Sequence, residues 1–162
     1  MSQEKIERHQ LTHLYMQPGH LLRRAHQIAA SIFHDELGNH ITPIQYAVLR
    51  ILKEYSGIDQ VTLAGLVAID TSTAASVALR LEEKGLLVRH IDPENRRQRK
   101  LHLTAEGIDL LEQAKDGIYR LENRIFTGLT NEEAQQFMVL LQKMVDANNA
   151  LSRAPLIKPP KK

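Results

Sequence analysis

The stretch from Leu63 to Thr104 constrains the fold of this 162-residue chain more than any other part of it. It begins with two short amphipathic helices, which are indicated by apolar residues at helical spacing. A turn at Ile69–Asp70 separates the helices, and Lys84–Gly85 closes the second one. Two helices joined in this way predict a helix-turn-helix. The apolar residues that define them are Leu63, Leu66 and Val67, followed by Val77, Leu79 and Leu81.

After Gly85 the sequence takes the pattern of a β-hairpin. Aliphatic and β-branched residues run from Leu86 to Ile91, the polar segment DPENRRQRK follows, and Leu101 and Leu103 then alternate with polar neighbours. A hairpin directly after a helix-turn-helix is a wing. Its tip carries more cations than carboxylates: Arg96, Arg97, Arg99 and Lys100 stand against Asp92 and Glu94.

The excess of positive charge at the wing tip favours contact with phosphate. Cationic side chains release condensed counterions when they bind a duplex, and an arginine on a thin hairpin can enter a minor groove that is too narrow for a helix. The alternative is a charged tip that is only solvated. Because a helix-turn-helix lies immediately upstream, we predict that Arg96, Arg97 and Arg99 contact double-stranded DNA.

The segment IDTSTAASVALRLEEKGLLVRHIDPENRRQRKLHLTAEG resembles the winged-helix signature of the MarR family of bacterial transcriptional regulators. The LEEKGLL run, the DPxxRR tip and the LTxEG that starts the next helix stand in the family's order, and the flanking helices extend the likeness over most of the chain. The resemblance implies a mainly α fold with a small β wing, in which a winged helix-turn-helix domain is joined to a helical dimerisation region.

Two residues depart from the family pattern. Many relatives have an aspartate two residues before the minor-groove arginine, which orients that arginine, whereas Asn95 stands at this place before Arg97. Asparagine accepts a hydrogen bond but carries no charge, so we expect a less rigidly held wing. The recognition helix has Ser76 where relatives often have arginine, which predicts weak readout of guanine.

Base edges are expected to be contacted by hydroxyl groups in the first turns of the recognition helix. Either of the first two of these residues can instead be the N-cap of the helix. The expected side chains are Thr71, Ser72, Thr73 and Ser76.

Two further residues of the helix-turn-helix are candidates for phosphate contacts. Arg80 is either such a contact or an ion-pair partner of Glu82 or Glu83. Thr62, at the start of the preceding helix, is placed to offer a hydroxyl and helix N-terminal amides to a phosphate.

The composition excludes several kinds of site. A formal charge of +2 is too small to attract nucleic acid in general, so DNA binding depends on where the charge lies. The chain has no cysteine, which excludes disulfides, thiolate nucleophiles, cysteine zinc sites and the thiol-oxidation switch of some MarR-like proteins. The polar start MSQEKIERHQ and the lack of a long apolar run predict a cytoplasmic protein without a membrane segment.

Two long amphipathic helices are predicted after the wing. The first is capped by Thr104 and expected to run unbroken to Ile125, and the second starts at a capping box of Thr130 and Glu133. A small winged domain cannot cover both apolar faces. We therefore predict a two-fold homodimer whose recognition helices meet successive major grooves of a pseudo-palindromic operator.

Helix signals before the wing complete the division of the chain. Pro18 opens a long first helix that ends at Gly38, and Thr42–Pro43 opens the next. The proline-rich basic tail is expected to be flexible, a DNA-tracking arm being the alternative. The predicted parts are an N-terminal helix for dimerisation and a ligand cleft (1–41), the winged domain (42–103), C-terminal dimerisation helices (104–151) and the tail (152–162).

The segment PGHLLRR on the first helix resembles the start of the branch that senses aromatic carboxylates. In that branch the effector lies in a cleft between the first, second and fifth helices. An anionic aromatic ligand needs an arginine for its carboxylate and an apolar slot for its ring. Solvated cations on a helix margin are the alternative, and Arg23 and Arg24 are equivalent candidates. The predicted ligand residues are His20, Arg23, Arg24, Phe33 and Tyr46.

The primary hypothesis is a homodimeric repressor, without a cofactor, that a small aromatic carboxylate releases from its operator, controlling aromatic-acid catabolism. A ligand-independent DNA-architectural protein is the first rival, because serine and threonine offer modest readout. A metal-responsive regulator is the second, since His9 and His13 have the spacing of a helical metal pair, although no HExxH arrangement accompanies them. An enzyme is not expected, because neither a phosphate loop nor GxSxG is present.

Overall fold

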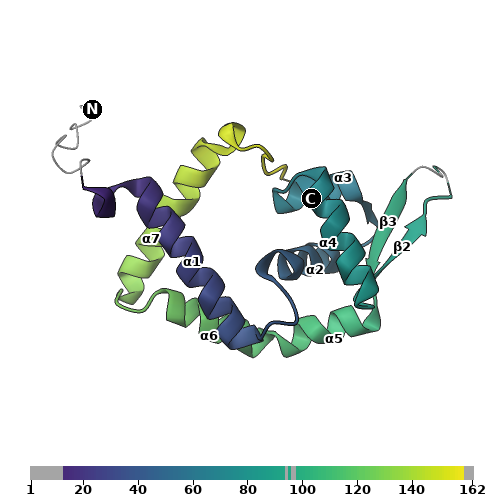
Figure 1. The fold of residues 1–162 in the computed structure, drawn as a ribbon, viewed down its shortest axis with the longest axis horizontal. Coiled ribbons are helices and arrows are strands. Elements are labelled where there is room, and N and C mark those ends of the chain that lie inside the picture. The colour runs from purple at the N-terminus through teal and green to yellow at the C-terminus, as the bar shows by residue number, and fades with distance from the viewer. Residues whose placement is uncertain (1–12, 94, 96–97, 159–162) are drawn as a thin grey trace.

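The computed structural model describes residues 13–93, 95 and 98–158. In Figure 1, α1, α6 and α7 lie on one side, the winged domain lies on the other, and the segment after α7 returns to α3. Two short 3-10 helices, η2 and η3, flank this array at Leu14–Met16 and Asn149–Leu151. The elements between them are α1 Pro18–Leu37, α2 Pro43–Glu54, β1 Ile58–Asp59, α3 Gln60–Val67, α4 Thr71–Glu83, β2 Leu87–Ile91, β3 Arg99–Leu103, α5 Ala105–Gln113, α6 Lys115–Ile125 and α7 Asn131–Ala147.

The predicted helix-turn-helix and wing are confirmed, and one apolar core holds them together. Leu49 and Leu52 of α2, Leu63 of α3, Leu81 of α4 and Leu101 of β3 are all fully buried in this core. These residues come from four elements that are far apart in sequence. The apolar stripes seen in the sequence therefore meet in a single interior.

A third strand, β1, was missed by the sequence analysis. It pairs with β3 in antiparallel fashion, with Ile58 opposite Leu101, and the sheet order is β1-β3-β2. A strand of two residues is too short to show alternation, so its formation depends on the edge that β3 offers.

The prediction of one unbroken helix after Thr104 was wrong, because α5 and α6 are separated at Ala114. The backbone of Ala114 has ψ −14°, outside the α-helical value, although the Ile118 amide still donates to its carbonyl. On one side of this joint α5 packs on the winged domain, and on the other α6 packs along α1. A Cβ on Gly117 would lie 2.7 Å from Leu37, so glycine allows the close approach of α6 to α1.

Ion pairs reinforce the packing of α1 on α6. Arg120 Nε donates to Glu36 at 2.7 Å, and Arg124 donates to both Glu36 at 2.6 Å and Asp35 at 3.1 Å. Hydrogen bonds from Arg124 and Arg120 lower the pKa of the Glu36 carboxyl. The C-terminal half of α1 is therefore tied to α6 by both packing and charge.

The last helix, α7, starts at the predicted capping box of Thr130 and Glu133 but buries none of its residues. The tail was predicted to be flexible from Ser152. The structure instead places its first part, up to Lys158, beside α3, where the Ile157 amide donates to the Gly65 carbonyl at 2.9 Å.

In the described part of the chain, no single helix is both long and apolar enough to cross a membrane. Only α3 and α4 taken together reach that length and composition, and the chain bends by 106° between them.

We predict that Gly107→Ala lowers the free energy of unfolding by about 1–3 kcal/mol, although alanine is the better helix former. A Cβ at this position in α5 would overlap the carbonyl oxygen of Leu86, which cannot move without shifting the wing. Urea unfolding followed by circular dichroism measures the change. Gly19→Ala in α1 is the control, because nothing lies within 4 Å of its Cβ position; equal stability of the two variants would contradict the prediction.

Candidate nucleic-acid interface

The turn between α3 and α4 presents one face of α4 outward. Ala68 closes α3 in the left-handed conformation with φ 56°. Four residues of α4 then face the core and are buried, whereas the opposite face is exposed. The buried residues are Ala74, Val77, Ala78 and Leu81.

The exposed face of α4 holds most of the predicted contact residues. Thr73 is half-buried at the edge of this face, and Leu79, which sequence analysis did not assign to the interface, is 46% exposed among the polar side chains. The structure thus brings the predicted contact residues of α4 onto one surface. The exposed predicted residues are Thr71, Ser72, Ser76 and Arg80.

The N-cap of α4 is Asp70, so the alternative that Thr71 or Ser72 caps the helix was wrong. The Asp70 carboxylate accepts from the Ser72 hydroxyl and from the amide and hydroxyl of Thr73, at 2.9 and 2.6 Å respectively. These hydrogen bonds, with Ser72 first, lower the pKa of Asp70 well below its usual range. Because both hydroxyl protons are in use, Ser72 and Thr73 can only accept from a base, whereas Thr71 and Ser76 can also donate.

Arg80 is an exposed cation for which no hydrogen bond or ion pair exists within the described residues. Its possible partner Glu82 binds Arg89 of β2 instead, with Arg89 Nε donating at 2.8 Å. The hydrogen bond from Arg89 lowers the pKa of the Glu82 carboxyl. Of the two roles predicted for Arg80, the structure favours the phosphate contact.

The start of α3 is occupied by a carboxylate. Asp59 accepts from the amides of Val61 and Thr62 at 2.8 and 3.0 Å, and from the Thr62 hydroxyl at 2.8 Å. Burial raises the pKa of Asp59, but the hydrogen bonds from Thr62 and Val61 outweigh it and the net shift is downward. A phosphate contact at Thr62 would require Asp59 to give up these hydrogen bonds.

The wing is a tight hairpin with an internal ion pair. Lys100 lies 3.2 Å from the buried Asp92 carboxylate, and the Asn95 amide donates to the Asp92 carbonyl. Arg99 is exposed at the start of β3. The predicted contacts Arg96 and Arg97 lie outside the described residues.

At the N-terminal end of α1, His20 and Arg23 lie together. Arg23 donates to Gln27 at 2.8 Å and its other terminal nitrogen lies 3.5 Å from His20 Nδ1, so its charge meets neutral partners. The ring of Tyr15, missed by sequence analysis, meets His20 edge-on at 5.7 Å. Arg24 is exposed and has no partner within the described residues.

The other two predicted ligand residues lie elsewhere. Phe33 is buried in the core and packs edge-on against Tyr46 at 6.1 Å, and burial raises the pKa of the Tyr46 hydroxyl. At a rise of about 1.5 Å per residue, Arg23 and Phe33 are separated by roughly 15 Å along α1. One chain therefore does not bring the predicted cations and the predicted aromatic slot into one site.

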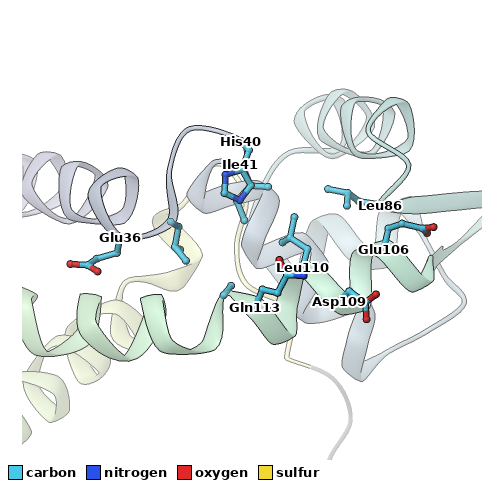
Figure 2. Close-up of a pocket in the computed structure, with 10 residues that line it drawn as sticks. Glu36, His40, Ile41, Leu86, Glu106, Asp109, Leu110 and Gln113 are labelled. Atoms are coloured by element: carbon cyan, nitrogen blue, oxygen red, sulfur yellow. The ribbon is translucent and has the colours of Figure 1, made fainter.

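A cavity of about 520 Å³ lies between the end of α1, Leu86 and α5 (Figure 2). The volume suits a small ligand. However, Glu36, Glu106 and Asp109 line it, and neither arginine nor lysine does. This charge disfavours an organic anion.

Within residues 13–93, 95 and 98–158, no group of three histidines and carboxylates is arranged to hold a metal ion. His13 is described but His9 is not, so the predicted metal pair is not tested.

A comparison with protein families now places this geometry. The MarR family model matches residues 41–98, which cover α2, the helix-turn-helix and most of the wing. Transcriptional regulator HosA from Escherichia coli O111:H- is 34% identical over 79% of this chain and 94% of its own length. The chain belongs to the MarR family. It is therefore a transcriptional regulator rather than an enzyme.

Two solved MarR-like structures share the fold. BpsR from Bordetella bronchiseptica, whose DNA binding is regulated by 6-hydroxynicotinic acid, is 33% identical with a TM-score of 0.78, covering 83% of this chain and 96% of its own. A MarR variant from E. coli in complex with operator DNA is 25% identical with a TM-score of 0.74, covering 78% and 92%. The winged-helix fold seen here is thus one that binds operator DNA in a relative.

We predict that Arg80→Ala weakens DNA binding and lowers the slope of log affinity against log salt by about 1 per chain, because one phosphate contact is lost. Arg89→Ala is the matched control, since it removes an equal charge that is already paired with Glu82; it should lower the melting temperature and leave the slope unchanged. Fluorescence anisotropy over a salt series gives both slopes. Equal slopes in the two variants would exclude the phosphate contact.

Proposed function

We propose that this MarR-family regulator is a homodimeric repressor that binds a pseudo-palindromic operator and is released from it by a small aromatic carboxylate. The observation that carries the DNA-binding part is the exposed face of α4, on which Thr71, Ser76 and Arg80 have no internal use. Arg96, Arg97 and Arg99 are proposed to add wing contacts, with Arg97 in the minor groove. Such a repressor acts in the cytoplasm, where it meets the chromosome.

The proposal of a dimer rests on apolar surface that a single chain leaves uncovered. A groove of about 830 Å³ is lined by α1, α6 and α7, and Phe137 and Met138 of α7 are 44% and 48% exposed at its wall. Exposed apolar surface of this extent marks an interaction site. A second copy fits, because a two-fold axis offers the same helices as partners and spaces two α4 helices for successive major grooves.

Phe137→Glu should convert the dimer to a monomer, because it places a charge in the apolar groove beside Phe126, whose ring lies 6.2 Å away. Gln136→Glu, on the opposite face of α7, adds the same charge and should leave the dimer intact. Sedimentation velocity at micromolar concentration separates the two states. A dimeric Phe137→Glu protein would show that this groove is not the interface.

The proposed effector site is the N-terminal end of α1, where positive charge is concentrated. Among the described residues, no side chain caps this 20-residue helix, so its free amides favour an anion. Arg23 and Arg24 add cations, and Nε2 of His20 is buried without a hydrogen-bond partner. The ring of Tyr15 beside His20 supplies an aromatic edge for the ring of the acid. Phe33 and Tyr46 of the original set can contribute only if the partner chain brings its own α1 to them.

The proposed release mechanism is a shift between two arrangements of the winged domains. An acid bound at α1 contacts the dimerisation helices and favours a spacing of the α4 helices that does not match the duplex. Its effect on operator affinity equals the ratio of its affinities for the two arrangements. The regulation of BpsR by 6-hydroxynicotinic acid is a precedent for an acid of this class.

A panel of benzoates, hydroxycinnamates and pyridine carboxylates should include an acid that releases a fluorescent operator. Arg23→Ala or Arg24→Ala should raise the concentration needed by at least about tenfold, because a desolvated charged hydrogen bond is worth roughly 1.5–3 kcal/mol. Arg50→Ala on α2 is the control, since Arg50 pairs with Glu54 away from this end of α1. A flat response to every acid, or unchanged sensitivity in both α1 variants, would remove this site.

A DNA-architectural role remains the second candidate, favoured by the use of the Ser72 and Thr73 hydroxyls by Asp70. A repressor should prefer its operator over random DNA by about a thousandfold or more at fixed salt. A ratio near one would favour the architectural role.

A further inference from the structure

We propose that the segment Asn149–Lys158 is an intramolecular strap that restrains the winged domain relative to the dimerisation helices and so raises operator affinity. In Figure 1 this segment leaves the end of α7 and reaches α3. The restraint is a property of the fold, whereas its effect on operator affinity rests on the proposed function.

The strap is anchored to the end of α7 by side-chain hydrogen bonds. The Asn149 amide group donates to the Leu156 carbonyl at 3.0 Å, and the Leu156 amide donates back to the Asn149 side-chain oxygen at 2.8 Å. Lys158 pairs with Asp146 of α7 at 3.2 Å. One asparagine thus closes the loop at both of its ends, which fixes the direction in which Ile157 leaves.

The other end of the strap binds α3 at Gly65. The Ile157 amide donates to the Gly65 carbonyl at 2.9 Å, and that carbonyl lies in the last turn of α3, where helical partners run out. A Cβ on Gly65 would lie 2.9 Å from Cδ1 of Ile157 and 3.2 Å from its Cβ and Cγ1. The isoleucine therefore occupies the space that the glycine leaves open.

The strap adds a third connection between the two halves of the molecule. The first two are the α1–α2 link at residues 38–42 and the passage from α5 into α6, both on the opposite side from the α3 contact (Figure 1). Two connections on one side permit the winged domain to hinge about that side. A third on the far side opposes the hinge, because opening it would break the Ile157 hydrogen bond and its contact with Gly65.

A restrained winged domain binds DNA with a smaller loss of conformational freedom. In the proposed dimer both α4 helices must meet successive major grooves at one spacing, so a domain that is already held loses less entropy on binding. Releasing the strap should therefore weaken operator binding while leaving every DNA contact residue in place.

The test uses two variants that act at opposite ends of the strap. Gly65→Met fills the space occupied by Ile157 with a residue that favours a helix, and Asn149→Ala removes both hydrogen bonds to Leu156. Hydrogen–deuterium exchange of the peptide 154–158 reports on the strap directly, since the Leu156 and Ile157 amides are both hydrogen-bonded. Both variants should lose this protection and keep the parent's circular dichroism and melting temperature within a few degrees.

Operator affinity then tests the consequence. Each variant should bind about fivefold more weakly or worse, and Gly65→Met should have no further effect in a chain that ends after Arg153. Peptide 154–158 as fast-exchanging in the parent as in the variants would overturn the strap, as would unchanged or tighter operator binding in both. If the parent itself binds no operator, the proposed function fails, while the exchange data still decide whether the strap forms.

Discussion

The direction of the recognition face depends on one constraint, which is the burial of the inner stripe of α4. Val77 and Leu81 pack into the same core as Leu49 and Leu101, and this leaves Ser76 and Arg80 no orientation except outward. The wing is placed by the same core, because Leu87 and Leu101 are fully buried within it. The interface is therefore rigid because it is the outer surface of a packed interior.

Charge is arranged locally in this protein, and that arrangement explains more than the net charge of +2. Carboxylates that could repel DNA are engaged internally: Asp70 caps α4, Asp59 caps α3, and Glu82 pairs with Arg89. Arg80 has no such partner within the described residues. The result is an exposed cation beside neutralised acids, which suits phosphate without making the whole molecule basic.

The same reasoning separates the two hollows of the chain. The cavity beside Leu86 has the volume of a ligand site, but three carboxylates line it. The N-terminal end of α1 has less enclosure and more positive charge. An organic anion is expected where the charge is favourable, and a second chain can supply the missing walls.

The sequence by itself determined the helix-turn-helix, the wing, the caps at Thr42, Thr104 and Thr130, and the family. These features depend on periodicity, on turn residues and on local capping, all of which are written in neighbouring residues. The tertiary structure decided what depends on distant contacts. The joint at Ala114 serves two different packing partners, and β1 exists only because β3 offers an edge. The capture of the Ser72 hydroxyl by Asp70 and the separation of Arg23 from Phe33 depend on side-chain geometry. The docking of Ile157 on Gly65 joins positions that are far apart in the chain, and no local pattern could have predicted it.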